Sequence, residues 1–326
     1  MFNLLKSLLR TVKEVLKKAN PFSKYGEDSS VLYIIKKMLA FVGIYLFNAI
    51  GMEAAIIISF SAMGYDFLAG EMPDNFFILN LLPLYGFVFF AIGSVLYAKF
   101  VEKRSLSDIG LTFNLKSVWR FVKGMLLSVV VLAPIFAVMC ALGIYEFTGF
   151  GTVSASMFAV YFGAFLVQAT SEEIMCRGFL MTSVGKKFAK PVAVFFSSIA
   201  FIAPHLQSMS PYGVEDLVSI INLVLVSIFF SILFYKYDTI SMCAGFHMGW
   251  NFIVSYVCGL QLSGMESSGE SLVNMNVNAS NIFLSGGEYG LEGSVIVTVA
   301  LVLIDLLAFF VLRSHLNKQK TQPETK

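Results

Sequence analysis

The stretch "ATSEEIMCRGF", residues 169–179, places charged side chains inside one of the most apolar parts of the chain. Two adjacent carboxylates, Glu172 and Glu173, follow the apolar run "MFAVYFGAFLVQ", and Arg177 comes one helical turn later. Ionisable side chains within a membrane span are costly and usually serve a function. Glu173 and Arg177 have i, i+4 spacing, which predicts an ion pair on one helix face. Glu172 lies about 100° further around the helix, where it is a candidate general base.

Two further apolar segments carry polar side chains of the same chemical interest. His205 ends "SSIAFIAPH", and "GFHMGWNF" carries His247 and Asn251 on one helix face. Each could be a structural residue that is hydrogen-bonded in the core or to a neighbouring helix, and this reading stays open. A base beside donors that could stabilise an oxyanion would instead suit hydrolysis of a peptide bond.

The composition indicates that these residues sit in membrane helices. Of 326 residues, 57% are hydrophobic and only 13% are charged, which is far below the share typical of soluble domains. The net charge of +2 gives no reason to expect a nucleic-acid partner. Eight apolar runs predict an all-α, polytopic bundle. The spans are expected near 38–62, 77–98, 124–143, 155–180, 191–205, 217–235, 239–259 and 294–312.

The distribution of Lys and Arg predicts the orientation of this bundle. All 23 basic residues fall in 1–37, 99–123, 177–190, at Lys236 and in 313–326. The intervening loops, near 63–76, 144–154, 206–216 and 260–293, contain neither Lys nor Arg. Because basic loops stay on the cytoplasmic side, eight spans with both termini inside explain the alternation at every loop.

Helix rise brings the polar residues to a common depth. From the inner turn near residue 188, Glu172 and His205 both lie roughly 25 Å along their helices. From the next inner turn, near residue 237, His247 lies about 15 Å and Asn251 about 21 Å forward, so Asn251 is the closer match. One carboxylate, two imidazoles and an amide are therefore expected to converge from three spans. The single acids Glu53 and Asp305 have no predicted partner.

The regions outside the spans are simpler. Residues 1–37 form a basic N-terminal segment whose first 20 residues have the pattern of an amphipathic helix on the inner leaflet. Residues 38–312 form the bundle and 313–326 a short cytoplasmic tail. The four cysteines form no C-x-x-C pair, so neither a disulfide framework nor a thiolate metal site is indicated.

The three motifs together resemble the CPBP family. They read E-E-x-x-x-R (Glu172, Glu173, Arg177), F-x-x-x-H ending at His205, and H-x-x-x-N (His247, Asn251), all in one region from about 155 to 255. This family contains CAAX prenyl proteases of the Ras-converting type and bacterial relatives labelled Abi or bacteriocin-processing proteins. It is regarded as a family of metal-independent intramembrane glutamic endopeptidases, so the resemblance implies neither a metal nor another cofactor.

The resemblance implies a role for each motif residue. Glu172 matches the carboxylate that activates water together with the second-motif histidine, here His205. His247 and Asn251 match the pair that stabilises the oxyanion. Glu173 and Arg177 match the pair that supports and orients the first glutamate.

Other functions remain open from the sequence. Glu172, His205 and His247 would also make a three-ligand zinc site with an open fourth position. A non-enzymatic immunity factor, a partner-binding protein or a transporter could likewise bury Glu and His. A cysteine peptidase using Cys176 is a more remote alternative.

The expected partners are the lipid bilayer and a peptide or membrane-protein substrate, and a bacterial plasma membrane is the expected location.

Overall fold

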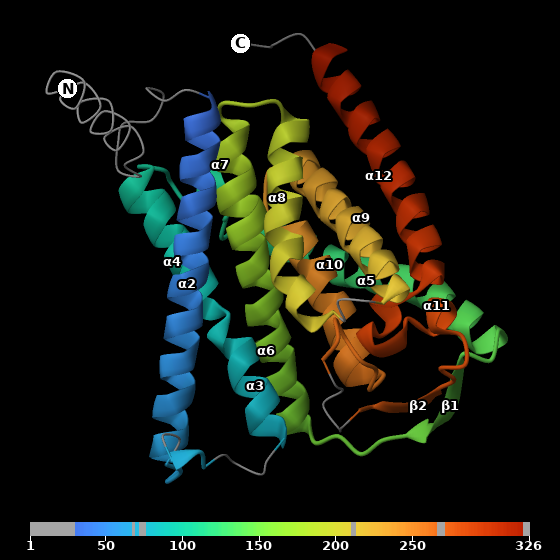
Figure 1. The fold of residues 1–326 in the computed structure, drawn as a ribbon. Coiled ribbons are helices and arrows are strands. Elements are labelled where there is room, and N and C mark those ends of the chain that lie inside the picture. The colour runs from blue at the N-terminus through green and yellow to red at the C-terminus, as the bar shows by residue number, and fades with distance from the viewer. Residues whose placement is uncertain (1–29, 67–68, 72–75, 210–212, 266–270, 322–326) are drawn as a thin grey trace, which may run out of the picture.

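A bundle of long helices dominates the molecule (Figure 1). The computed structural model describes residues 30–66, 69–71, 76–209, 213–265 and 271–321. Within this part of the chain, the predicted all-α, polytopic membrane bundle is confirmed. The amphipathic segment predicted for the first 20 residues lies outside the described residues.

Six helical segments of the described part are long and apolar enough to cross a membrane. The predicted short span at 191–205 is one of them, and the first helix begins at Ser30 rather than at residue 38. The helices concerned are α2 (Ser30–Ala62), α3 (Phe76–Gly86) with α4 (Val88–Leu96) and the π-helix η2 (Tyr97–Val101), α5 (Leu115–Ala141), α8 (Lys190–His205), α9 (Val214–Tyr237) and α12 (Val295–Thr321).

The other two predicted spans, 155–180 and 239–259, are the ones that carry polar motifs. Both are helical, and both continue into a π-helix. The first consists of α6 (Ala155–Glu173), the π-helix η4 (Ile174–Met181) and α7 (Thr182–Gly185). The second consists of α10 (Ser241–Asn251) and the π-helix η6 (Phe252–Val257). Every residue of η4 is buried, and so is every residue of α10 after Ser241. Because these segments face other helices rather than lipid, they can hold polar side chains. The count of eight spans and their orientation remain predictions.

Local signals in the sequence explain where several helices begin. The Asn114 side chain accepts a hydrogen bond from the Ser117 backbone N–H at 2.9 Å and caps α5. The Ser154 hydroxyl accepts from the Met157 N–H at 3.1 Å and caps α6. Pro191 lies in the first turn of α8, where its missing N–H costs no helical hydrogen bond. Ser154 and Pro191 thus mark the start of the helices that carry the first two motifs, α6 and α8.

Glycines bring α10 close to α5. A Cβ atom at Gly245 would collide with the Phe121 carbonyl of α5, and a Cβ at Gly249 would collide with the Ser128 hydroxyl. Gly245 and Gly249 form a G-x-x-x-G pair, which lets two membrane helices approach at backbone distance. The motif helix α10 is therefore held against α5 by close contact along one face.

A two-stranded sheet joins two of the loops without Lys or Arg. β1 (Tyr145–Phe150) pairs antiparallel with β2 (Val273–Val277), with a register shift between Phe147 and Gly149. The loop that contains β2 also forms α11 (Ile282–Ser285), η7 (Gly287–Tyr289) and η8 (Leu291–Gly293), and η5 (Leu206–Ser208) is a short turn in the loop after α8. The sheet was not expected from the sequence, and Figure 1 shows it at the end of the bundle away from the α7–α8 turn.

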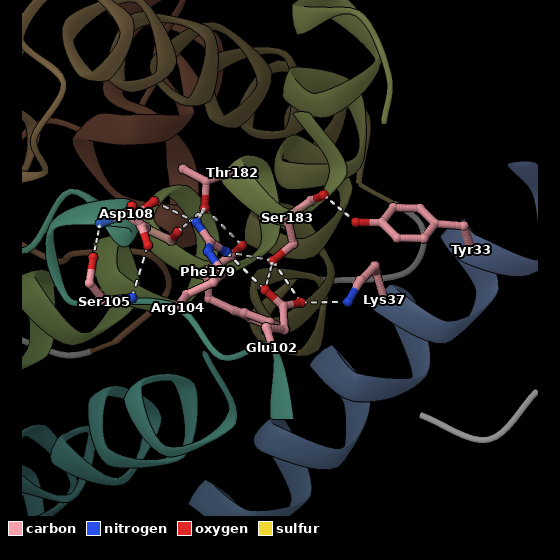
Figure 2. A network of polar contacts seen from close by, with 10 residues as sticks. Tyr33, Lys37, Glu102, Arg104, Ser105, Asp108, Phe179, Thr182 and Ser183 are labelled. Atoms are coloured by element: carbon pink, nitrogen blue, oxygen red, sulfur yellow. Dashed lines mark hydrogen bonds and ion pairs between the residues drawn. The ribbon is translucent and has the colours of Figure 1, made fainter. Parts of the chain in front are cut away.

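A buried network of charges lies at the α7–α8 end of the bundle (Figure 2). Lys37 donates to Glu102 at 2.5 Å and Arg104 donates to the same carboxylate at 3.0 Å. These three side chains are at most 7% exposed. Arg104 also donates to Ser183 at 2.9 Å and to Thr182 at 2.5 Å, both in α7. The network therefore ties α2 and the end of η2 to the helix that follows the first motif.

Asp108 extends this network in the loop before α5, within which η3 (Ser107–Ile109) forms one 3₁₀ turn. Its backbone carbonyl accepts from Arg104 at 2.5 Å, and its carboxylate accepts from the Ser105 backbone N–H at 2.9 Å. Hydrogen bonds with the backbone and the side chain of Ser105 hold the pKa of the Asp108 carboxyl below its usual range. The ionised carboxylate is therefore the form that stabilises this loop.

Candidate active site

The ion pair expected between Glu173 and Arg177 is present and completely buried. Arg177 donates to Glu173 Oε1 at 2.9 Å, and both side chains are 0% exposed. The guanidinium also lies between two aromatic rings, 4.4 Å from the centroid of Phe201 and 5.0 Å from that of Phe230. Arginine suits this position because its planar cation can stack on rings while its N–H groups bond elsewhere.

Two serines complete the surroundings of Arg177. Its second terminal nitrogen donates to the Ser227 hydroxyl of α9 at 2.8 Å, and Ser227 donates to the Ser198 hydroxyl of α8 at 2.9 Å. Arg177 thereby connects α6 and η4 to two neighbouring helices. Neither serine was identified from the sequence, because a serine in an apolar helix gives no signal of its partner.

His247 lies between the two glutamates. Its Nδ1 is 3.1 Å from Glu173 Oε1, and its Nε2 is 3.7 Å from Glu172 Oε2. The ring stacks on Phe230 with centroids 5.2 Å apart. Because a carboxylate only accepts hydrogen bonds, the contact with Glu173 places a proton on Nδ1 and directs Nε2 toward Glu172.

The position of His247 differs from the depth count, which gave Asn251 as the better match to Glu172. The reason is the α9–α10 turn, which lies inside the bundle. Thr239 and Ile240 are 1% and 3% exposed, and both donate hydrogen bonds to the Gly110 carbonyl, at 2.8 and 3.1 Å. Since α10 starts deeper than the count assumed, His247 reaches the level of the glutamates.

Asn251 pairs with a residue that the sequence reasoning missed. The Asn251 amide donates to Gln168 Oε1 of α6 at 2.9 Å, and both residues are buried. Gln168 precedes Glu172 by four residues, so it lies on the same helix face. That spacing was the available signal, since an uncharged amide in an apolar run is otherwise easily passed over.

His205 contacts the backbone of its own helix. Its Nδ1 is 2.8 Å from the Phe201 carbonyl oxygen, and its ring packs 5.0 Å from the Phe201 ring. A carbonyl can only accept, so the neutral ring carries its proton on Nδ1. The remaining nitrogen, Nε2, is then an acceptor, as a base requires.

One cavity connects the residues of the second and third motifs with Glu172. Its volume is about 480 Å³, and its walls include Glu172, His205, His247 and Asn251 as well as Gln168. Glu172 is 8% exposed, and its Oε2 has no hydrogen-bond partner within the described part of the chain. The walls toward α2, α3 and α4 are mainly apolar, with Tyr45, Met52, Pro83, Leu84, Phe87 and Phe90. The cavity therefore combines a small polar region with a larger apolar one.

The helices that carry Glu172 and Glu173 (α6) and His247 and Asn251 (α10) change to π-helical geometry directly after these residues. η4 begins at Ile174, immediately after Glu173, and η6 begins at Phe252, immediately after Asn251. Single π-helical turns are frequent at functional sites, because the extra residue per turn shifts the side chains that follow.

The remaining candidate residues have separate positions. Glu53 is exposed on α2, while Asp305 in α12 is partly buried, with both carboxylate oxygens lacking a hydrogen-bond partner in the described residues. Cys176 is 1% exposed. No group of three His, Cys, Asp or Glu side chains in the described ranges has a geometry that could hold a metal ion, so the zinc set of Glu172, His205 and His247 gains no support.

Comparison with known proteins identifies a family whose sequences resemble the segment that carries the site residues. The model of a family described as type II CAAX prenyl endopeptidase, Rce1-like, matches residues 154–253. No curated protein matches the chain. The matched segment starts at the cap of α6, ends within η6 and contains all three motifs. The family expected from the motifs is thus confirmed over this segment, and the chain is a membrane protein with a region similar to Rce1-like type II CAAX prenyl endopeptidases.

Proposed function

We propose that the chain is a metal-independent intramembrane endopeptidase in which Glu172 and His205 activate water and His247 and Asn251 stabilise the oxyanion. The observation that carries the proposal is the shared cavity, which these four side chains line from three different helices. The Rce1-like match supports the class of peptide hydrolase.

The state of Glu172 suits a base that takes a proton from water. Its Oε2 is buried and lacks a hydrogen-bond partner among the described residues, although a buried carboxylate oxygen normally has one. His205 Nε2 is an acceptor for the reason given above. Two acceptors on one cavity can hold a water molecule, with Glu172 removing one proton while His205 orients the other.

The opposite role, donation to the oxyanion, falls to His247 and Asn251. Asn251 uses one amide hydrogen on Gln168, so its second remains available for a substrate oxygen. His247 already donates from Nδ1 to Glu173, so it can donate from Nε2 only as an imidazolium. The proposal therefore requires a doubly protonated His247 when the tetrahedral intermediate forms, and Glu173 is placed to balance that charge.

The proton balance closes with these groups alone. Water adds its oxygen to the carbonyl carbon while Glu172 accepts the released proton. When the C–N bond breaks, the protonated Glu172 returns this proton to the leaving amine. The buried pair of Glu173 and Arg177 positions the helix turn that carries Glu172.

The substrate in this proposal is a peptide or a membrane-protein segment that enters the cavity from the bilayer. We place the protein in a bacterial plasma membrane, with the Lys- and Arg-rich segments on the cytoplasmic side, because basic loops are retained there.

The test compares variants of the purified protein in detergent on a library of internally quenched peptides. Glu172→Gln and His205→Gln should each reduce kcat by about 10²–10⁴, the range for loss of a general base. Glu53→Gln is the matched control, because Glu53 is exposed on α2 and outside the cavity. Its activity should equal that of the wild type.

Two results would count against the proposal. Full activity of a folded Glu172→Gln variant would remove the proposed base and favour a non-enzymatic role for this residue. Loss of activity with a chelator, followed by recovery with zinc, would replace the metal-independent mechanism with a metal-dependent one.

A further inference from the structure

A second carboxylate lines the cavity, and the mechanism above does not use it. Glu292 belongs to η8, in the loop between β2 and α12 (Figure 1). Glu292 lines the same cavity as Glu172, His247 and Asn251. The short sequence "SGGEYGLEGS" that contains it lies outside the region matched by the family model.

The position of this carboxylate is fixed by neutral donors. Trp250 Nε1 donates to Glu292 Oε1 at 3.2 Å, and the Ser263 hydroxyl donates to Oε2 at 2.5 Å. The Glu292 backbone carbonyl accepts from the Asn222 amide at 2.8 Å. Trp250 directly precedes Asn251 on α10, so Glu292 is attached to the helix that carries the proposed oxyanion donors.

No Lys or Arg of the described cavity lining is available to balance the charge of Glu292. The described lining contains neither Lys nor Arg, and Glu172 and Glu292 are its two carboxylates. An indole and a hydroxyl orient a carboxylate, but they do not cancel its charge. A carboxylate in an enclosed cavity attracts a cation more strongly than one in open water, because the local dielectric constant is lower.

We propose that Glu292 is a specificity-determining residue that binds the cationic side chain of a Lys or Arg in the peptide substrate. The inference rests on the proposed function, since it assumes that the cavity holds a peptide near the scissile bond. The cation would pair with Glu292 while the neighbouring carbonyl is held at His247 and Asn251. A substrate whose free carboxylate must enter this end of the cavity would be repelled by the same charge.

Glu292→Gln separates recognition from loop structure. Glutamine keeps one oxygen that can accept from Trp250, and its NH2 group can donate to the Ser263 hydroxyl, which can also accept, but it removes the negative charge. A peptide cleaved by the wild type is prepared with Lys, norleucine or Glu at each of the three positions on either side of the cut. Norleucine keeps most of the length of Lys without its charge.

The expected result is a selective loss. At one position the wild type should prefer Lys over norleucine by about 10- to 100-fold in kcat/KM, the range for a charge-assisted hydrogen bond. Glu292→Gln should abolish this preference and leave cleavage of the norleucine peptide within about twofold of the wild type. If Glu292 only anchors its loop, the variant should instead lower both rates in parallel and reduce the melting temperature, which would overturn the inference.

A binding measurement keeps the inference separate from the proposed function. The Lys and norleucine peptides are titrated against the wild type and Glu292→Gln. Tighter binding of the Lys peptide that disappears in the variant supports the inference even if no peptide is cleaved, in which case the peptidase proposal alone fails. Equal binding of both peptides by the wild type overturns it, even if Glu172-dependent cleavage is found.

Discussion

The buried pair of Glu173 and Arg177 gives a sharp test of the structure. Replacing Arg177 by Met removes the partner of a carboxylate that is 0% exposed, together with the contact to Ser227. Breaking a buried ion pair on one side typically costs about 3–5 kcal/mol, because the other charge is left without compensation. Arg177→Met should lower the free energy of unfolding by this amount.

Replacing the other partner, in Glu173→Gln, should lower the free energy of unfolding by less. In Glu173→Gln, the amide oxygen can still accept from Arg177 and His247, and Arg177 keeps Ser227 and the two phenylalanine rings. The loss is then about 1.5–3 kcal/mol, the value of a hydrogen bond to a charged group. The double variant Glu173→Gln/Arg177→Met leaves no charge unpaired. Its loss of unfolding free energy should therefore be smaller than the sum of the two single losses by at least about 2 kcal/mol.

The assay is unfolding in mixed micelles with an increasing fraction of SDS, followed by tryptophan fluorescence and circular dichroism for all four proteins. Additive losses would refute the reasoning, since they would mean that Glu173 and Arg177 do not interact when folded. A small loss for Arg177→Met alone would equally contradict burial of the pair.

Three further predictions concern other parts of the molecule. Gly245→Val should destabilise the protein by about 1–3 kcal/mol or more through its collision with Phe121, whereas Gly43→Val, with no neighbouring atom within 4 Å of its Cβ, should be nearly neutral in the same unfolding assay. Gln168→Leu should lower kcat by up to about 100-fold with little change in stability, because Asn251 loses its positioning partner. Asp108→Asn should be less stable than the wild type at neutral pH. This difference should become smaller as the pH falls through the lowered pKa of Asp108, because the wild type then loses the stabilisation that its ionised carboxylate provides. SDS unfolding from pH 7 to pH 3 measures the difference.

Much of the fold follows from hydropathy, because a bilayer requires long apolar helices. The short span at 191–205 was predicted from this rule and appears as Lys190–Ser208 among the helices able to cross a membrane. The sheet between β1 and β2 could not be predicted in the same way. Strand pairing between segments more than 100 residues apart depends on how the helices place the loops, which no local pattern encodes.

The motif residues were identifiable because charges in apolar runs stand out, but their detailed contacts were not. The depth count placed Glu172, His205, His247 and Asn251 at similar levels, and all four line one cavity. The depth count could not anticipate that the α9–α10 turn is hydrogen-bonded to the Gly110 carbonyl in the loop before α5. This contact brings His247 to the level of the glutamates. Gln168 and Glu292 escaped attention because one is uncharged and the other lies in a loop where acids are common.

The environments of the two adjacent glutamates explain why membrane helix α6 carries both. Glu173 is entirely enclosed, and its Oε1 accepts from Arg177 and contacts His247, so its charge is balanced. Glu172 lies further around the helix, lines the cavity and keeps one oxygen without a hydrogen bond in the described structure. A single carboxylate could not be held rigidly by an arginine and also be free to take a proton from water. Two neighbours about 100° apart divide these tasks, so the cost of burying one charge is offset by its ion pair while the other stays available for chemistry.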